Sequence, residues 1–438
     1  MTLESNTQTE VAIANTPGDA AGDAKAAPDR GGPQRVYRVA IVFPRAQPYY
    51  CKFFQRLAAH PAIDLDVYFY SDLGSRGTLD PGYQVPIEWD LDMWSGYKYY
   101  FPHNYAPRPE LARFSGSFHP SLVLDLSPSR YDVVLMHGWW GLTTWITLAA
   151  LIARRVPVLI YSDKNVIDWH GGWRQGIRNG LLRFIFSGVD AFTAIGKRNA
   201  EFYRSLGIPQ SKIFPTPLAV DNDFFQHEWR RLEPQRATLR AQVGIPADAV
   251  VILTIGRLLP WKGILDLVKA FSTLGDNEKV HLVIAGDGPQ RAELEAFVAA
   301  GKIPRVHFAG FQNYTQVPTY YAMSDIFVLP SFREPWGCVV SEAMNFALPI
   351  VASRDGGAVG DLVEDGENGF LFDYGSVEQL AGHLKYLAAN PEIRQKMGEK
   401  SAARVMNWNF DRGVEGFLAA LQYVESERRF RVRAAPVP

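Results

Sequence analysis

Short, almost wholly apolar runs alternate with helix-patterned segments along the chain from Val36 onward. Runs of this kind are typical of strands that are buried on both faces of a parallel sheet. The intervening segments carry their apolar residues at helical spacing, which predicts helices that cover the sheet. The strands expected in this first series are 36–43, 65–70, 131–138, 156–162 and 190–196. The expected helices are 49–60, one that follows the third strand and runs through Ala149, and 180–187.

A second series of the same kind starts at Ala249, after a polar and charged stretch, 221–246, that suits an interdomain connection. Two such series in tandem predict an α/β fold of two doubly wound, Rossmann-like domains that face a cleft. In sheets of this kind, ligands bind at the carboxyl ends of the strands. The strands expected in this series are 249–258, 279–288, 306–311, 326–331, 348–353 and 369–373, and its first helix is 265–274.

The predicted domains are an N-terminal one over residues 35–225 and a C-terminal one over residues 226–412. Residues 1–34 are rich in Ala, Gly, Thr, Asp and Pro and have almost no large apolar side chains. Burial cannot offset the entropy of ordering such a segment, so we expect a disordered tail. The last segment, 413–438, is expected to be helical, and it is the element that would cross back onto the first domain.

The bulk composition narrows the classes of protein that fit. The 438-residue chain has a formal net charge of −1, whereas a nucleic-acid-binding protein would usually carry a strong basic excess. Only two cysteines occur, Cys51 and Cys338, which favours a reducing, cytoplasmic compartment. No stretch reaches the roughly 18 consecutive apolar residues of a membrane span, and the N-terminus lacks a secretory pattern.

One basic, partly amphipathic segment, 172–186, bears on membrane contact. Such a segment suits anionic lipid, but a core-facing helix with solvated arginines is the simpler interpretation. We therefore expect a cytoplasmic protein and keep peripheral contact with the inner face of the membrane as the open alternative. Nothing in the sequence indicates an oligomeric state.

The most informative segment is EPWGCVVSE, residues 334–342. Glu334 follows an expected strand, and Glu342 lies within the helix expected next. Gly337 stands near the start of that helix, where free backbone N–H groups and the helix dipole favour an anion and a glycine permits close approach. A carboxylate before the helix can accept hydrogen bonds from sugar hydroxyls, and one within the helix can reach a ribose.

These residues resemble the retaining GT-B glycosyltransferases of family 4, in which two such glutamates lie within E-x-aromatic-G and E-A-M. The resemblance is strong over residues 249–388 and weaker in the first domain. The positions that carry it are Glu334, Trp336, Gly337, Glu342, Ala343, Met344, Pro349, Gly356 and Gly357, together with DGENGFLF (365–372), IGRLLPWKG (255–263) and IAGDGP (284–289).

The resemblance implies roles for these residues. Arg257 and Lys262 match the two cations that bind the donor diphosphate, where fixed positive charge stabilises the negative charge that develops. Glu342 matches the residue that binds the ribose hydroxyls, and Glu334 matches the one that holds the hydroxyls of the transferred sugar. The other positions expected at the nucleotide sugar are Trp336, Gly337, Cys338, Gly256, Gly286 and Gly288.

The first domain offers fewer candidates. His137 follows an expected strand, at a position where the family often has a histidine that faces the donor sugar across the cleft. The loop PRAQPYY (44–50) departs from the family because it lacks paired glycines. The candidates for acceptor contacts are Arg45, Gln47 and Tyr49 in this loop, and Asp163 and Lys164 in the loosely matching YSDKN.

The resemblance therefore implies a retaining hexosyltransferase of glycoconjugate or polysaccharide biosynthesis. It would move a hexose-type sugar from a nucleoside diphosphate to a saccharide, lipid-linked or small-molecule acceptor. No cofactor and no metal are expected, and the D-x-D strings at 64–66 and 90–92 are too common to predict a metal site. A front-face mechanism is implied, with a covalent intermediate still open. The alternatives are a sugar-nucleotide epimerase, a phosphorylase-like enzyme or an inactive sugar-nucleotide-binding protein.

Overall fold

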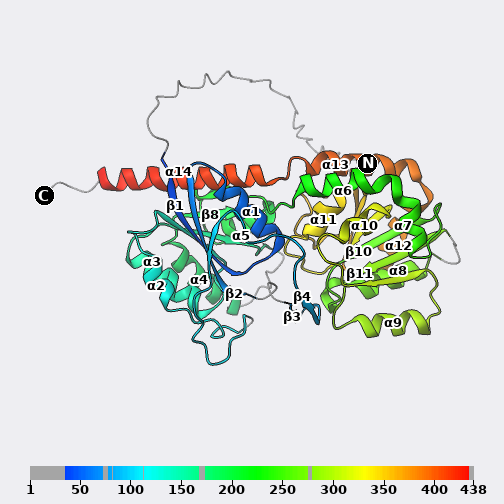
Figure 1. Ribbon diagram of the computed structural model, residues 1–438, viewed down its shortest axis with the longest axis horizontal. Helices are drawn as coiled ribbons and strands as arrows, with labels where there is room; N and C mark the ends of the chain where they lie inside the picture. The colour runs from blue at the N-terminus through cyan, green and yellow to red at the C-terminus, as the bar shows by residue number, and fades with distance from the viewer. Residues whose placement is uncertain are drawn as a thin grey trace, which may run out of the picture. The chain divides into compact units, whose positions relative to one another are not determined.

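The computed structural model describes residues 35–72, 77–80, 82–111, 113–166, 173–274 and 279–433. The tail predicted over 1–34 and the end of the helix predicted over 413–438 lie outside these ranges. Figure 1 shows two parallel sheets, each flanked by helices, which confirms the predicted α/β class. We call the part built on the first sheet the first lobe and the part built on the second sheet the second lobe.

The first lobe is built on a parallel sheet with strand order β5-β2-β1-β6-β7-β8-β9. Along the interior strand β1, Val39 and Ile41 enter one core while Ala40 and Val42 enter the other, so both faces are covered. The strands are β1 (Tyr37–Arg45), β2 (Ile63–Ser71), β5 (Lys98–Tyr100), β6 (Val133–His137), β7 (Val158–Ser162), β8 (Ala191–Ala194) and β9 (Ile213–Pro215). The helices are α1 (Pro48–Ala58), α2 (Ser121–Asp125), α3 (Leu142–Ala153), α4 (Trp173–Phe186) and α5 (Lys197–Ser205).

The second lobe has a parallel sheet with strand order β12-β11-β10-β13-β14-β15. Helices α8 and α12 cover the face to which Ile252 contributes. The strands are β10 (Val250–Ile255), β11 (Val280–Ala285), β12 (Val306–Gly310), β13 (Ile326–Leu329), β14 (Ile350–Ser353) and β15 (Gly369–Phe372). The helices are α8 (Ile264–Ser272), α9 (Arg291–Ala300), α10 (Val317–Ala322), α11 (Cys338–Met344), α12 (Val377–Ala389) and α13 (Pro391–Val405).

The polar stretch 221–246, interpreted from the sequence as a connection, is largely helical. It contains α6 (Asn222–Leu232) and α7 (Arg236–Gln242), and α6 packs against α10 of the second lobe. The Asp221 side chain caps α6 by accepting a hydrogen bond from the Phe224 N–H at 3.1 Å. This stretch is therefore part of the second lobe's packing.

The chain passes between the lobes a second time after α13. Helix α14 (Phe410–Arg433) packs on β8, β9 and α1 of the first lobe (Figure 1). The two passages are bonded to each other, because the Asn222 amide donates to the carbonyls of Val405 at 3.2 Å and Trp408 at 3.0 Å. The Trp408 indole N–H in turn donates to the Leu218 carbonyl at 3.0 Å.

A small hairpin in the first lobe was not anticipated from the sequence. Strands β3 (Thr78–Asp80) and β4 (Val85–Ile87) pair antiparallel, and their turn reaches the second lobe. A Cβ on Gly82 would lie 2.7 Å from the Arg257 side chain, so hairpin and arginine are in contact. Within the described residues, none of the helices is both long and apolar enough to cross a membrane.

Candidate active site

The segment that begins at Glu334 is held between β13 and α11 by its backbone. Gly337 adopts a φ of 89°, in the left-handed region that favours glycine, and the chain turns there into α11. The Gly357 N–H donates to the Glu334 carbonyl at 2.9 Å. A Cβ on Gly357 would lie 1.9 Å from the Pro335 carbonyl oxygen, so only glycine allows the loop this close approach.

Glu334 and Lys262 form a buried ion pair at the carboxyl ends of the second lobe's strands. Lys262 ends a short 3₁₀ turn, Pro260–Lys262, that follows β10. Burial by itself raises the pKa of Glu334, but the Lys262 charge and hydrogen bond, with smaller contributions from Ser331 and Arg257, hold that pKa below its usual range. The Glu334 carboxylate is therefore ionised at neutral pH.

Arg257 shares a small cavity of about 130 Å³ with this ion pair. The hairpin turn at Gly82 lies against its side chain, and Asp80 anchors the turn by pairing with Arg45 at 2.8 Å and accepting the Gly82 N–H at 2.7 Å. The cavity is lined by Tyr49, Tyr83, Thr254, Ile255, Gly256, Arg257, Lys262, Ile264, Leu329, Pro330, Ser331, Glu334, Gly337, Cys338 and Val339. Two cations and a carboxylate thus meet in one cavity.

Glu342 is buried in α11, outside the lining of this cavity, and accepts a hydrogen bond from the Tyr321 hydroxyl at 2.7 Å. Burial raises the pKa of Glu342 to about 7, and the Tyr321 hydrogen bond only partly opposes this shift. Tyr49 is its neighbour: burial raises the pKa of the Tyr49 phenol, and the charges of Cys338 and Glu342 raise it further. The carboxyl predicted to meet a ribose therefore lies beneath residues that line the cavity.

The glycines predicted near the phosphates bring two strand ends together. Gly286, at the end of β11, has a φ of 148°, and a Cβ there would lie 1.8 Å from the Gly256 carbonyl oxygen. A Cβ on Gly288 would lie 2.7 Å from the Leu258 carbonyl oxygen. Side chains are excluded from both places, so the loop of Arg257 packs directly on the turn after β11.

Trp336 and Cys338 point to different sides. The Trp336 ring stacks on Trp408 with centroids 5.1 Å apart, and its edge abuts Gly196 of the first lobe. Its side chain does not line the cavity, so only its backbone is available for the predicted contact with the nucleotide sugar. Cys338 does line the cavity, and burial raises the pKa of its thiol.

His137 lies at the end of β6 in a second cavity of about 510 Å³, which also contains Asp163 and Lys164. The ring is 4.1 Å from the Phe43 ring between centroids, and its buried Nε2 has no hydrogen-bond partner among the described residues. Burial lowers the pKa of His137 even though the Asp163 charge opposes that shift, so the imidazole is neutral at pH 7. Among the described residues, its Nε2 is a buried polar atom without a hydrogen-bond partner.

The structure places the three acceptor candidates of the loop after β1 at different sites. Tyr49 lines the cavity of Glu334, whereas Arg45 pairs with Asp80 and lines, with Arg257, a further pocket of about 750 Å³. Gln47 stands at the start of α1, where its backbone carbonyl accepts the Cys51 N–H at 3.0 Å. Of these, Tyr49 lines the cavity of Glu334 and not the cavity of His137.

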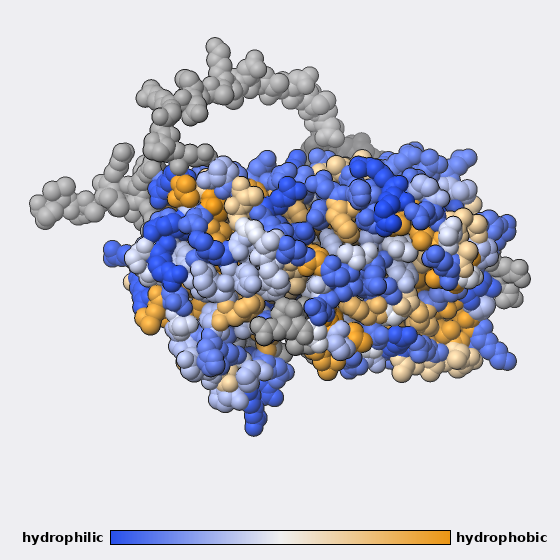
Figure 2. Space-filling model, in the orientation of Figure 1, coloured by the Kyte–Doolittle hydropathy of each residue, from blue (hydrophilic) through white to orange (hydrophobic). Residues whose placement is uncertain are grey.

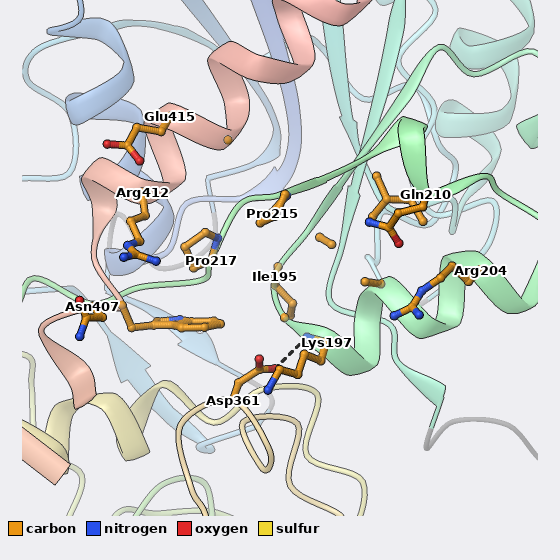
Figure 3. Close-up of a pocket in the computed structure, with 16 residues that line it drawn as sticks. Ile195, Lys197, Arg204, Gln210, Pro215, Pro217, Asp361, Asn407, Arg412 and Glu415 are labelled. Atoms are coloured by element: carbon orange, nitrogen blue, oxygen red, sulfur yellow. Dashed lines mark hydrogen bonds between the residues drawn. The ribbon is translucent and has the colours of Figure 1, made fainter. Parts of the chain in front are cut away.

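Sequence reasoning missed the support that α5 gives to the loop behind Glu334. Arg198 donates to the carbonyls of Gly356 at 2.7 Å and Arg354 at 2.9 Å, and the Lys197 N–H donates to Asp361 at 2.8 Å. Figure 3 shows Lys197 and Asp361 facing each other at the edge of a separate pocket, beside α14. The helical pattern around Arg198 gives no local signal of such a contact, because its partners are backbone groups more than 150 positions away.

Aspartates of both D-x-D strings form hydrogen bonds with other parts of the protein. Asp66 accepts the Tyr131 hydroxyl at 2.6 Å, and Asp90 accepts the Thr315 N–H at 3.1 Å across the lobes. In the part of the chain that the structure describes, no three His, Cys, Asp or Glu side chains gather as a metal site would require.

Known proteins resemble this chain in sequence and in structure. The protein-family model for glycosyl transferases group 1 matches residues 235–404. The family model for the glycosyl transferase 4-like domain matches residues 81–219. An alpha-D-kanosaminyltransferase of Streptomyces kanamyceticus is 34% identical over 204 residues, which cover 46% of this chain and 52% of that protein. Several curated relatives are likewise spanned over only about half to two thirds of their length.

Two further comparisons cover most of the chain. A D-inositol 3-phosphate glycosyltransferase of Acidothermus cellulolyticus is 31% identical over 442 aligned residues, covering 91% of this chain and 93% of that protein. The structure of Anabaena Alr3699/HepE in complex with UDP and glucose has a TM-score of 0.65 and 18% identity, covering 88% and 99%, and so shares the fold. Since the two family models together match more than half of the chain and a relative above 30% identity is covered almost throughout, this chain belongs to the group 1 family of glycosyl transferases, with the GT-B fold.

Proposed function

We propose that the protein is a retaining glycosyltransferase that moves a hexose-type sugar from a nucleoside diphosphate to an acceptor hydroxyl. The observation that carries the proposal is the cavity in which Arg257, Lys262 and Glu334 meet at the carboxyl ends of the strands. Ligands bind at this edge of doubly wound sheets. Relatives are glycosyltransferases by name, and the HepE neighbour was solved with UDP and glucose, which supports a nucleotide-sugar donor.

Each residue of the cavity suits one part of such a donor. Arg257 and Lys262 would bind the diphosphate, which gains negative charge as its bond to the sugar breaks. Glu334 would accept hydrogen bonds from the sugar hydroxyls while Lys262 keeps it ionised. Glu342 would bind the ribose hydroxyls. Backbone N–H groups near Trp336, Gly337 and Cys338, and the close-packed glycines 256, 286 and 288, would leave room for the phosphates.

The ion pair bears on the mechanism. A carboxylate whose charge is engaged by Lys262 is a weak nucleophile, which favours a front-face reaction without a covalent intermediate on Glu334. The acceptor oxygen forms a bond to the anomeric carbon as the bond from that carbon to the diphosphate oxygen breaks. The acceptor proton passes to the leaving phosphate oxygen. The acceptor oxygen bonds to the anomeric carbon on the face that the diphosphate leaves, so the configuration at that carbon is retained. The neutral imidazole of His137 would hydrogen-bond a hydroxyl of the sugar or the acceptor.

The two cations would stabilise the leaving diphosphate, so we infer transfer without an added divalent metal or other cofactor. Saccharide, lipid-linked and small-molecule hydroxyls all suit the reaction. Arg45, Gln47, Asp163 and Lys164 remain the proposed acceptor contacts, and Tyr49 is now proposed on the donor side because it lines that cavity.

The test is release of nucleoside diphosphate from UDP-, GDP- and ADP-sugars by the purified chain, with and without EDTA. We expect turnover with one donor class and no loss with EDTA. Glu334→Gln should lower the rate by about 100- to 1,000-fold, as expected when one charged group no longer stabilises the transition state. Glu378→Gln, an exposed glutamate in the first turn of α12, is the matched control and should leave the rate unchanged.

The assay also separates the alternatives. An epimerase would return an altered nucleotide sugar, and an inactive binding protein would bind nucleotide without turnover. Absence of both turnover and nucleotide binding with all three donor classes would refute the proposed function.

A further inference from the structure

Helix α4 carries apolar side chains on two different faces. Leu182 and Phe186 are buried in the core of the first lobe, as expected for a core-facing helix. Ile177, Leu181 and Phe184 lie outside that core, with exposed fractions of 65%, 48% and 78%. Their spacing of i, i+4 and i+7 aligns them in a single stripe on the helix. Packing against the core therefore explains only one of the two apolar faces.

The stripe continues onto two neighbouring loops. Trp140, in the loop after β6, is 63% exposed, and its ring lies edge-on to the ring of Phe114 at 5.9 Å between centroids. Both rings and Leu181 line the cavity that contains His137. We call Phe114, Trp140, Ile177, Leu181 and Phe184 together the α4 surface.

A contiguous apolar surface of this kind usually marks an interaction site. Figure 2 shows hydrophobic surface interrupting the hydrophilic surface in the part of the molecule where Figure 1 draws α2 to α4. Within the α4 surface, Phe114, Trp140 and Leu181 line the cavity of His137. An interaction through this surface would therefore also involve the mouth of that cavity.

The charge beside the α4 surface indicates what it contacts. The sequence of α4 contains three arginines and no acidic residue, although the chain as a whole has a net charge of −1. Arg178 and Arg183 are exposed next to the apolar stripe. An apolar stripe flanked by arginines and bordered by a tryptophan is the pattern of a helix that lies in the interface of an anionic bilayer. We propose that the α4 surface docks onto an anionic membrane.

Docking in this orientation has a consequence for the acceptor. The cavity reached through Trp140 and Leu181 extends to His137 and Asp163 at the ends of the strands. An acceptor anchored in the bilayer would present its polar head to this cavity without leaving the membrane. The assignment of a lipid-linked acceptor rests on the proposed function, whereas the docking itself does not.

Flotation of the full chain with vesicles tests the docking. We expect binding to vesicles of phosphatidylcholine with added phosphatidylglycerol, weaker binding to phosphatidylcholine alone, and weakening by salt. The variant Ile177→Ser with Phe184→Ser should bind about 10- to 100-fold more weakly, because two apolar side chains no longer enter the bilayer. The variant Arg178→Gln with Arg183→Gln should lose about 10- to 30-fold, on the anionic vesicles only.

Phe297→Ser supplies the matched control, since Phe297 is 37% exposed on α9 of the second lobe. It should bind vesicles as the unchanged chain does. Calorimetry with UDP, GDP and ADP on the same samples monitors the nucleotide site, which all these substitutions should leave intact.

Two results would overturn the docking: no binding to anionic vesicles, or equal binding by the unchanged chain and both double variants. A dimer in light scattering that only the Ile177→Ser and Phe184→Ser variant dissociates would also overturn it, because a second copy would then cover the surface. Vesicle binding with no nucleotide binding would support the docking and count instead against the proposed function.

Discussion

The buried carboxyl of Glu342 leads to a prediction that needs no knowledge of the acceptor. Its pKa is raised from 4.5 to about 7 in the folded chain, and its unfolded value should be ordinary. Below pH 4.5 the carboxyl is neutral in both states, so the shift has no effect on stability there. As the pH rises from 4.5 to about 7, only the unfolded state ionises, and the folded state loses stability.

The size of the loss follows from the shift. At 1.36 kcal/mol for each unit of pKa, the difference corresponds to about 3 kcal/mol above pH 7. Glu342→Gln keeps an oxygen that can accept the Tyr321 hydrogen bond but cannot ionise. It should therefore unfold at a higher temperature than the unchanged chain at pH 8, by about 6–12 °C if the second lobe unfolds as a unit, and differ little at pH 4.5.

Thermal unfolding of both chains across this pH range measures the effect. The same substitution should weaken binding of the nucleoside diphosphate, because an ionised carboxylate accepts ribose hydrogen bonds that an amide accepts less well. In the unchanged chain the affinity should increase as the pH rises through about 7. Tyr321→Phe should move this midpoint upward, because the Tyr321 hydrogen bond lowers the pKa. An equal difference in unfolding temperature at pH 4.5 and pH 8 would show that the carboxyl is not perturbed and refute the reasoning.

Three other predictions test the site and its support. Lys262→Met leaves the Glu334 carboxylate buried without its cation and should destabilise the chain by about 3–5 kcal/mol in denaturant unfolding; unchanged stability would mean that the pair is solvated. Gly286→Ala should cost more than about 2 kcal/mol, because its Cβ would overlap the Gly256 carbonyl, whereas Gly382→Ala in α12, with open space around it, should not destabilise. Cys51 and Cys338 should both react slowly with a thiol reagent at pH 8 and quickly after unfolding, since burial raises the pKa of each thiol; rapid reaction of the folded chain would contradict their burial.

The strand framework could be predicted because parallel strands buried on both faces are nearly continuous apolar runs. The runs at 36–43, 131–138 and 326–331 became β1, β6 and β13 with ends shifted by only a few residues. The hairpin of β3 and β4 could not be found this way. Each of its strands has three residues, too few to show a period, and its position depends on the buried pairing of Asp80 with Arg45.

The candidate site likewise has features that the sequence predicts and features that it does not. The motif residues Arg257, Lys262 and Glu334 lie together because their strands end at one edge of the sheet, which follows from order along the chain. The direction in which a side chain points does not follow from the order of residues along the chain. Trp336 turns toward Trp408, more than 70 positions later, and Tyr49 turns toward the second lobe instead of toward His137. Such directions depend on packing between segments that no local pattern records.

The hydrogen bonds of Asn222 have a mechanical consequence. The backbone passes between the lobes twice, near Asn222 and near Trp408, and the Asn222 amide joins the two passages at one place. Two separate tethers would each permit the lobes to translate as well as rotate. Two tethers fixed to each other act as one pivot and leave rotation about that point as the low-energy motion. Because Trp408 also stacks on Trp336, two residues from Glu334, the pivot lies next to the cavity of Glu334, where a small rotation displaces atoms least, whereas it displaces the far rims of the lobes most.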